Sequence, residues 1–150
     1  MTRSHYTPDD PWLLPFLRTI RRRPQMYLGG STIWFLSMHI HAYITAREDL
    51  GIDCMREHEL LVAFGDWLSA HLGQTNTLGV FGLIEAADWK AKHPRRPYRR
   101  STNLTEDNFD TFYRYLDEFL ASRGETLARA PGHWPPRARD KVGTRRRKLR

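Results

Sequence analysis

Arg21-Arg22-Arg23-Pro24-Gln25-Met26-Tyr27-Leu28-Gly29-Gly30 is the stretch of this 150-residue chain that decides how its first helices are joined. Proline lacks an amide hydrogen and restricts the residue before it, so Pro24 predicts that a first helix ends by Arg23. Glycine reaches backbone conformations that other residues avoid, so the pair at positions 29–30 predicts a turn into a second helix. We expect the Met-Tyr-Leu run at positions 26–28 to plug the core between these two breaks.

Apolar residues that recur every three or four positions predict five helices between residues 10 and 124, with no competing strand pattern. Asp10 and Pro11 are typical of the cap and first turn of the first helix, and Ser31 or Thr32 would cap the second. The second helix, over residues 33–47, is apolar around most of its girth. We therefore expect it at the centre of the fold.

The remaining three helices are bounded by similar signals. Asp53 would cap the third helix, which lies between the stop signals Gly51 and Gly73. The fourth, over residues 77–89, is weakened by two internal glycines. An exposed basic loop over residues 90–102 follows it. The short connections predict an all-α fold, a compact bundle of about five helices.

The last helix has the clearest pattern, with Thr105 as its cap and Gly124 as its end. At 100° per residue, six apolar residues share one arc of roughly 120°; they are Phe109, Phe112, Tyr113, Leu116, Phe119 and Leu120. Acidic residues gather on one side of this arc and are interrupted by Arg114. We call Asp107, Asp110, Asp117 and Glu118 the acidic flank. Tyr115 lies off the arc, so we expect it to be exposed.

The basic character of the chain is concentrated at its C-terminal end. Residues 125–150 hold nine of the 24 cations and only two of the 17 acids, so residues 1–124 are neutral. The tail also contains prolines and glycines and lacks apolar periodicity, which is typical of a flexible segment. We expect an N-terminal arm over residues 1–9, a helical domain over residues 10–124 and a flexible basic tail over residues 125–150.

The sequence offers little support for an enzyme, a metal site or a cofactor. His39 and His41 would point about 200° apart on a helix, so they cannot share one ion. Cys54 is the only cysteine and is expected to be a small apolar filler. The serines lack a nucleophile motif, and no glycine-rich phosphate loop follows a strand. No long apolar segment or secretory leader is present, so we expect a cytoplasmic protein without a membrane partner.

Nucleic-acid binding is an alternative that rests on the tail and the basic loop. Arginines interleaved with an aromatic residue are typical of surfaces that bind phosphates and stack bases. The candidate residues for this activity are Arg95, Arg96, Tyr98, Arg99, Arg100, Arg145, Arg146, Arg147 and Lys148. The neutral domain shows no helix enriched in Arg, Lys, Asn and Gln, which a sequence-specific reader would need.

The connector over residues 21–29 resembles the Arg-Lys-Arg-Pro-Gly-Met-Tyr-Ile-Gly stretch of gyrase-B-type ATPases. In that family, the following helix carries an acidic water-activating residue and a magnesium-binding Asn, and an Asp-x-Gly-x-Gly motif comes later. Here residues 33–47 contain neither an acid nor an Asn, and the later motif does not occur. The resemblance therefore implies a shared local structure, and no catalytic residue is carried over.

A longer resemblance covers most of residues 11–124. It consists of the Arg-Pro-x-Met-Tyr-Leu-Gly connector, the Phe64-x-x-Trp67-Leu68 helix, and the final helix with Phe109, Phe112 and its Leu-Asp-Glu-Phe run at positions 116–119. These features resemble a loose group of small bacterial helical proteins, some of which resemble immunity partners of polymorphic toxins. The resemblance implies a non-enzymatic inhibitor that binds a cognate toxin domain.

The acidic flank agrees with such a function. An inhibitor of a nucleic-acid-directed toxin can place acids in a basic active cleft, and complementary charge accelerates the encounter. Our expected partner-binding residues are Asp107, Asp110, Arg114, Asp117 and Glu118, with Tyr115 as an exposed aromatic anchor.

Overall fold

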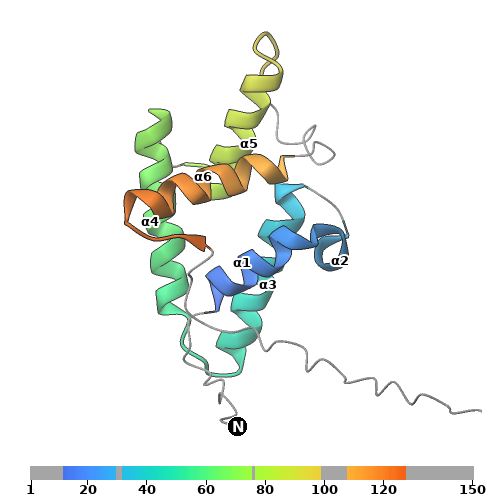
Figure 1. The fold of residues 1–150 in the computed structure, drawn as a ribbon, viewed down its shortest axis with the longest axis vertical. Helices are drawn as coiled ribbons and strands as arrows, with labels where there is room; N and C mark the ends of the chain where they lie inside the picture. The colour runs from blue at the N-terminus through green and yellow to red at the C-terminus, as the bar shows by residue number, and fades with distance from the viewer. Residues whose placement is uncertain (1–11, 30–31, 76, 99–107, 128–150) are drawn as a thin grey trace, which may run out of the picture.

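The computed structural model describes residues 12–29, 32–75, 77–98 and 108–127, and every regular element in those ranges is a helix (Figure 1). In chain order they are α1 (Leu13–Arg22), α2 (Pro24–Leu28), α3 (Ile33–Asp49), α4 (Met55–Leu72), α5 (Gly79–Lys92) and α6 (Phe109–Ser122). The predicted all-α fold is confirmed. The described ranges hold six helices where five were expected, because the connector itself contains α2. The N-terminal arm, the expected caps Asp10 and Thr105, and residues 128–150 lie outside these ranges.

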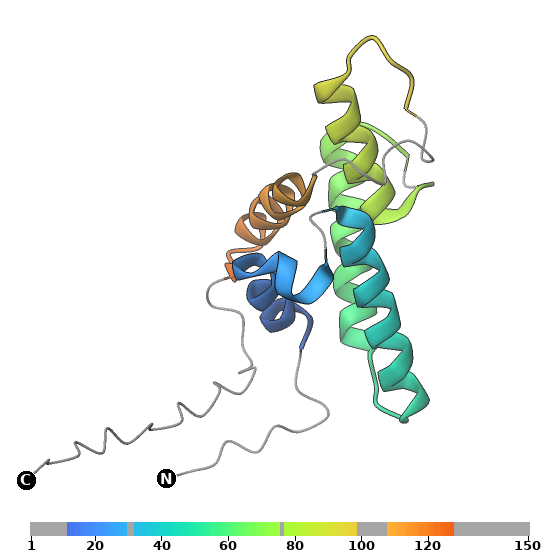
Figure 2. The same cartoon turned by 90° about the vertical axis from the view of Figure 1, so that its right-hand side faces the viewer.

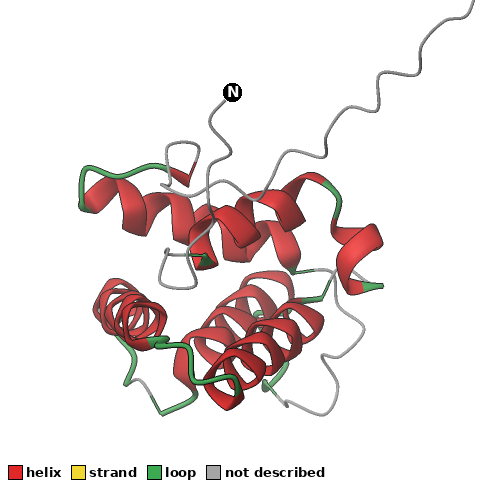
Figure 3. Ribbon diagram, turned by 90° about the horizontal axis from the view of Figure 1, so that it is seen from below, coloured by secondary structure: helices red, strands yellow, loops and turns green. Residues whose placement is uncertain are grey.

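The helices form two layers. Helices α3, α4 and α5 make one layer, and α1, α2 and α6 lie across one face of it (Figures 2 and 3). Helix α5 packs against α3 and α4 in its own layer and against α6 in the other. The sequence assigned the centre of the fold to α3, and that prediction was wrong because α3 buries a single stripe and leaves other apolar residues at the surface.

Helix α5 begins with two glycines that have different roles. Gly79 has φ of +68°, a left-handed conformation that favours glycine. Gly82 is buried, and a Cβ at this position would lie 2.7 Å from the Cβ of Leu78. The two glycines weaken α5 as an isolated helix, but each has a structural reason. Gly79 allows the turn that enters the helix, and Gly82 allows the close approach of Leu78.

Helix α6 supplies the apolar stripe that joins the two layers. All six residues of the predicted arc are buried, which confirms that part of the sequence analysis. Phe112 stacks on Phe81 of α5 with ring centroids 5.9 Å apart, and Phe119 stacks on Phe64 of α4 at 5.0 Å. Aromatic pairs at these separations contribute packing energy beyond the area that they bury.

The connector departs from its expected role as a plug. Pro24 does end α1 after Arg22, as predicted, but it also begins α2, where a proline without an amide hydrogen is well tolerated. Only Leu28 of the Met-Tyr-Leu run is buried, whereas Met26 and Tyr27 are exposed. A helical turn at residues 24–28 points successive side chains in different directions, so all three cannot enter one core.

Several predicted helix ends are confirmed. Gly51, Gly73 and Gly124 all have positive φ at or just beyond the ends of their helices. The cap position of α4 is Cys54, one residue after the predicted Asp53, although the Asp53 side chain accepts a hydrogen bond from the amide of Met55 at 2.8 Å. Helix α5 continues to Lys92, a few residues beyond the predicted end. Beyond Gly124 the packed chain continues at least to Leu127, which is buried in the core.

The start of α3 is capped by a residue from another part of the chain. Thr32 occupies the cap position, but its side chain forms no capping hydrogen bond. Instead, the amide of Ile33 donates to Oδ1 of Asn108 at 2.7 Å. Asn108 is itself buried at the start of α6, so the first turns of α3 and α6 are tied together.

Within the described ranges, every helix is too short or too polar to cross a bilayer.

Replacing Asn108 should destabilise the fold more than replacing Thr32. Asn108→Ala leaves the buried Ile33 amide without its acceptor, and we expect the free energy of unfolding to fall by about 1–2 kcal/mol. Thr32→Val removes a buried hydroxyl that has no hydrogen-bond partner among the described residues, so we expect no loss of stability. Urea denaturation followed by circular dichroism measures both changes. A larger loss for Thr32→Val would show that the threonine is the true cap.

Candidate partner-binding surface

Helix α3 buries one stripe of side chains and exposes another that is also apolar. Its buried residues recur at helical spacing; they are Ile33, Leu36, Ile40, Ile44 and Arg47. Because these residues share one side of the helix, Phe35 and Met38 must point elsewhere, and they are 39% and 52% exposed. Apolar residues on both sides of a helix raised the expectation of a central position, but Phe35 and Met38 on the outer side remain exposed.

The connector also exposes apolar residues, on a helix that adjoins α3. Met26 is 63% exposed and Tyr27 is 39% exposed on α2, and α2 packs against α3. Single exposed apolar residues are ordinary on protein surfaces, whereas a group on adjoining elements is typical of interaction sites. We call Met26, Tyr27, Phe35 and Met38 the apolar face.

A shallow groove runs beside the apolar face. It has a volume of about 480 Å³ and is lined by Phe16 of α1 and by Met38, His39, Ala42, Tyr43 and Ala46 of α3. Phe16 and Tyr43 stack with ring centroids 5.7 Å apart, and Trp12 lies 4.3 Å from Tyr43. These stacked rings form a fixed apolar wall, and the two alanines leave room for an incoming side chain. We call this feature the α3 groove.

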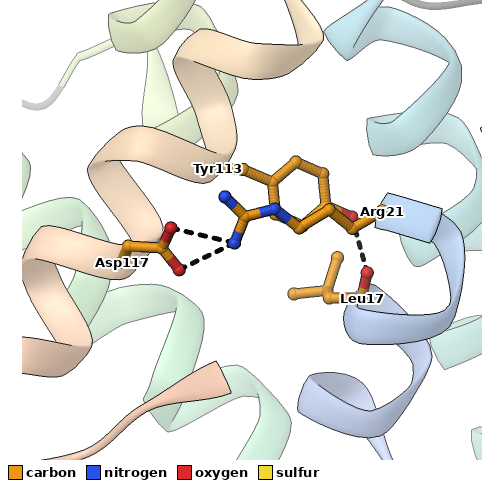
Figure 4. Close-up of polar contacts among 4 residues, drawn as sticks. All are labelled: Leu17, Arg21, Tyr113 and Asp117. Carbon is orange, nitrogen blue, oxygen red and sulfur yellow. Dashed lines mark hydrogen bonds and ion pairs between the residues drawn. The ribbon is translucent and has the colours of Figure 1, made fainter. Parts of the chain in front are cut away.

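A polar cluster on the other side of α1 fixes the direction of that helix. The hydroxyl of Tyr113 donates to the carbonyl of Leu17 at 2.7 Å, and Arg21 Nη1 lies 2.8 and 2.9 Å from the carboxylate oxygens of Asp117 (Figure 4). The guanidinium of Arg21 also lies 5.0 Å from the centre of the Tyr113 ring. We call these four residues the clasp, since they hold α1 against α6.

The two parts of the clasp differ in burial and therefore in strength. Tyr113 is almost completely buried, and this burial raises the pKa of its hydroxyl well above its ordinary value, with Arg21 opposing the shift and Asp117 adding to it. The hydroxyl is thus a neutral donor at physiological pH. Arg21 and Asp117 are both 44% exposed, so their ion pair contributes only about 0–1 kcal/mol.

The acidic flank is largely occupied by contacts within the protein. Asp107 lies outside the described residues, and Asp117 belongs to the clasp. Glu118 lies 3.5 Å from Nε2 of His71 on α4. Asp110 is exposed and has no ion-pair partner among the described residues. Arg21 of α1 pairs with Asp117, and Arg114 lies within the acidic flank itself. The flank therefore has less unpaired negative charge than its sequence indicates.

Tyr115 is buried, and its expected role as an exposed anchor was wrong. Its exposed fraction is 9%. His71 packs against it edge-on with ring centroids 5.9 Å apart, and the guanidinium of Arg114 lies 4.9 Å from the ring centre. The apolar arc of α6 is therefore wider than its six core residues, because α4 covers its edge.

The basic loop is exposed but does not present its aromatic residue freely. Arg95 and Arg96 are exposed, as predicted, whereas Arg99, Arg100 and residues 145–148 lie outside the described ranges. The hydroxyl of Tyr98 donates to buried Glu85 at 3.2 Å. A half-buried tyrosine with an engaged hydroxyl is a poor platform for stacking a base.

Two acids of α5 that the sequence analysis did not single out hold this region in place. Glu85 and Asp88 are both buried. Asp88 accepts a hydrogen bond from Thr111 at 2.6 Å and pairs with Lys92 at 2.8 Å. These two acids lie one turn apart on a helix face that is otherwise apolar. Acids in such a position indicate buried, partnered side chains, and this pattern could have been recognised in the sequence. Their contacts are structural links between α5, the following loop and α6.

A second pocket, of about 440 Å³, lies between α3, α4 and α5 and brings the side chains of Ser37 and His41 together. His41 Nδ1 lies 3.3 Å from the Ser37 hydroxyl but only 2.8 Å from the Ser37 carbonyl. A ring nitrogen that donates to a carbonyl cannot also take a proton from the hydroxyl. His58 on the opposite wall pairs with Glu48 at 2.7 Å. This arrangement does not activate the serine.

The described residues contain no group of three or more His, Cys, Asp and Glu side chains placed to hold a metal ion. The two histidines of α3 bond to carbonyls four residues before them, His39 to Phe35 at 3.0 Å and His41 to Ser37. Cys54 is buried and free, as expected of an apolar filler.

Comparison of the chain with protein-family models, curated proteins and solved structures finds no match. Function is therefore inferred from the surfaces described above.

The stabilising effect of Tyr113 should disappear in alkaline solution. Its raised pKa in the folded protein favours folding while the unfolded tyrosine keeps its proton. This contribution is lost as the pH rises through the ordinary tyrosine value of about 10 towards the higher folded value. We expect Tyr113→Phe to lower the free energy of unfolding by about 1 kcal/mol at pH 8 and the difference from wild type to shrink at pH 11. Urea denaturation at both pH values measures it, and a constant difference would contradict the assignment.

Proposed function

We propose that this chain is a non-enzymatic protein-binding module of the immunity or antitoxin type, which neutralises a cognate bacterial toxin. The observation that carries the proposal is the apolar face, whose four large side chains lie on the adjoining elements α2 and α3. Methionine and aromatic residues are enriched at protein interfaces, and aromatic residues are common among the few that supply most of the binding energy.

Exposure of this face has a cost for the free protein. Burying a methionine or phenylalanine side chain completely contributes about 1.5–3 kcal/mol, so a side chain that remains half exposed forgoes about 1 kcal/mol. Four such residues forgo a sizeable fraction of the 5–15 kcal/mol that stabilises a typical domain. A partner that covers the face recovers this free energy, which supports binding as the reason for its composition.

The apolar face and the α3 groove replace the acidic flank as the contact surface in this proposal. Only Asp110 of the described flank lacks an ion-pair partner in those ranges, and Tyr115 cannot serve as an anchor because it is buried. The α3 groove, in contrast, offers a concave site beside exposed anchors. An inhibitor that binds through such a face excludes the toxin's substrate by covering its active site.

The nucleic-acid alternative has less support in the described residues. Arg95 and Arg96 are available for phosphate contacts, but Tyr98 is bonded to Glu85. Affinity through these two arginines and the tail would depend on charge without an aromatic contribution. We therefore favour a protein partner.

Coexpression with the product of the adjacent gene in a bacterial host tests the proposed function. We expect the wild-type chain to restore growth of cells that express the toxin and Met38→Glu to lose this protection, with an affinity lower by about tenfold or more. Isothermal titration with the purified pair measures the affinity. Val62→Glu is the matched control, since Val62 is 61% exposed on α4, away from the apolar face.

Asp110→Lys separates the proposed surface from the acidic flank. It reverses the one described flank residue without a partner and leaves the clasp intact, so we expect protection to persist. Loss of protection with Asp110→Lys but not with Met38→Glu would assign binding to α6. Absence of both protection and binding in the wild-type chain would overturn the inhibitor function.

A further inference from the structure

The neutral helical domain is divided into a cationic part and an anionic part. Residues 12–47, which form α1, α2 and most of α3, contain five arginines and no acid. Residues 48–127 contain fourteen acids and nine cations. The neutrality of the domain therefore conceals a positive N-terminal part, and that part carries the apolar face.

The five arginines of the cationic part have different surroundings. Arg47 is buried beside the rings of Trp12 and Tyr43. Arg21 is neutralised by Asp117 in the clasp. Arg22 and Arg23 are exposed, and neither contacts a carboxylate among the described residues. Arg18, the fifth arginine, is half-buried. The exposed arginines of this part that contact no carboxylate among the described residues are therefore Arg22 and Arg23.

Arg23 lies at the edge of the apolar face, and Arg22 precedes it as the last residue of α1. Arg23 Nη1 is 3.9 Å from the sulfur of Met26, so charge and exposed apolar surface are in direct contact. Met38 belongs both to the apolar face and to the lining of the α3 groove. A cationic edge at Arg23 therefore adjoins an apolar face that continues into the groove.

We infer that Arg22 and Arg23, with the apolar face and the α3 groove, form the docking site for an acidic amphipathic segment of the partner protein. The partner's apolar side chain fills the groove, and its carboxylates pair with the two arginines. The inference rests on the proposed function and deepens it by naming the chemistry of the partner. Charge complementarity selects the occupant, because residues 12–47, which form the site, contain no acid.

The shape of the site favours a protein segment over other anions. A groove of about 480 Å³ holds a side chain, which neither a phosphate backbone nor a flat lipid surface supplies. Amphipathic helices commonly bind apolar grooves in this way, with anchors at helical spacing. The two arginines then set orientation and association rate more than total affinity.

The test uses the full-length protein and a synthetic amphipathic peptide of about 14 residues, with leucine and phenylalanine on one face and glutamate on the other. The comparison peptide carries glutamine in place of glutamate. We expect the acidic peptide to bind more tightly, and amide signals of residues 22–28 and 33–46 to move in nitrogen-15 NMR spectra. Equal binding of the two peptides, or movement confined to the tail, would overturn the inference.

Two matched double variants locate the charge dependence. Arg22→Glu with Arg23→Glu should weaken acidic-peptide binding by about tenfold. Lys90→Glu with Arg95→Glu makes the same charge change at exposed positions near the end of α5 and in the loop that follows it, and should leave binding unaltered. Both retain the basic tail, so its contribution cancels. If the first variant proves unstable in urea, Arg22→Gln with Arg23→Gln should still weaken binding, and unaltered binding would refute the site.

Oligothymidylate and phosphatidylglycerol vesicles serve as competing anionic probes. If either probe binds in a way that depends on Arg22 and Arg23 while binding of the acidic peptide does not, the occupant of the site is that kind of anion and not a protein segment. Failure of this inference is distinct from failure of the proposed function. A toxin that binds through Met38 but is indifferent to both arginine variants would retain the inhibitor function and refute the acidic partner.

Discussion

The hydrogen bond from the Ile33 amide to Asn108 is the contact on which the arrangement of the two layers depends. A helix start buried in the core must satisfy its free amide groups, and here the acceptor comes from a residue 75 positions away. The same helix α6 then binds α1 through Tyr113 and the carbonyl of Leu17. Since both bonds lie in the core, α6 orients the first and third helices together. The positions of α2 and of the surface that it shares with α3 follow from this constraint.

That constraint explains why the apolar surface of α3 is divided. The side of α3 that carries Ile33 must face α6 and the core, and residues spaced at three or four positions follow it inward. Phe35 and Met38 then remain on the outer side. Their exposure is a consequence of how the helix start is fixed, and the groove beside them forms where α1 crosses this outer side. The orientation of α3 thus determines both which of its residues pack in the core and which form the candidate binding surface.

The sequence predicted those features that depend on local patterns. The apolar arc of α6 and the glycine stops were correct because periodicity and backbone conformation are properties of short segments. Helix α3 was misplaced because a helix that is apolar on several sides does not indicate which side is covered. Tyr115 was misassigned because His71, from another helix, covers it. The candidate site was equally hard to predict. Which connector arginines remain unpaired depends on the pairing of Arg21 with Asp117, and those residues are 96 positions apart. Composition did contain one overlooked signal, the absence of acids over residues 12–47.

The three consecutive arginines of the connector show how one short segment serves both folding and binding. Successive residues of a helix point about 100° apart, so once Arg21 faces Asp117 on α6, its neighbours must point in other directions. Arg21 contacts the Tyr113 ring and is neutralised, whereas Arg22 and Arg23 keep their charge, with Arg23 at the edge of the apolar face. Pro24 then ends α1 and starts α2, which places Met26 next to Arg23. The clasp therefore determines more than stability, because it decides which arginines remain available to a partner.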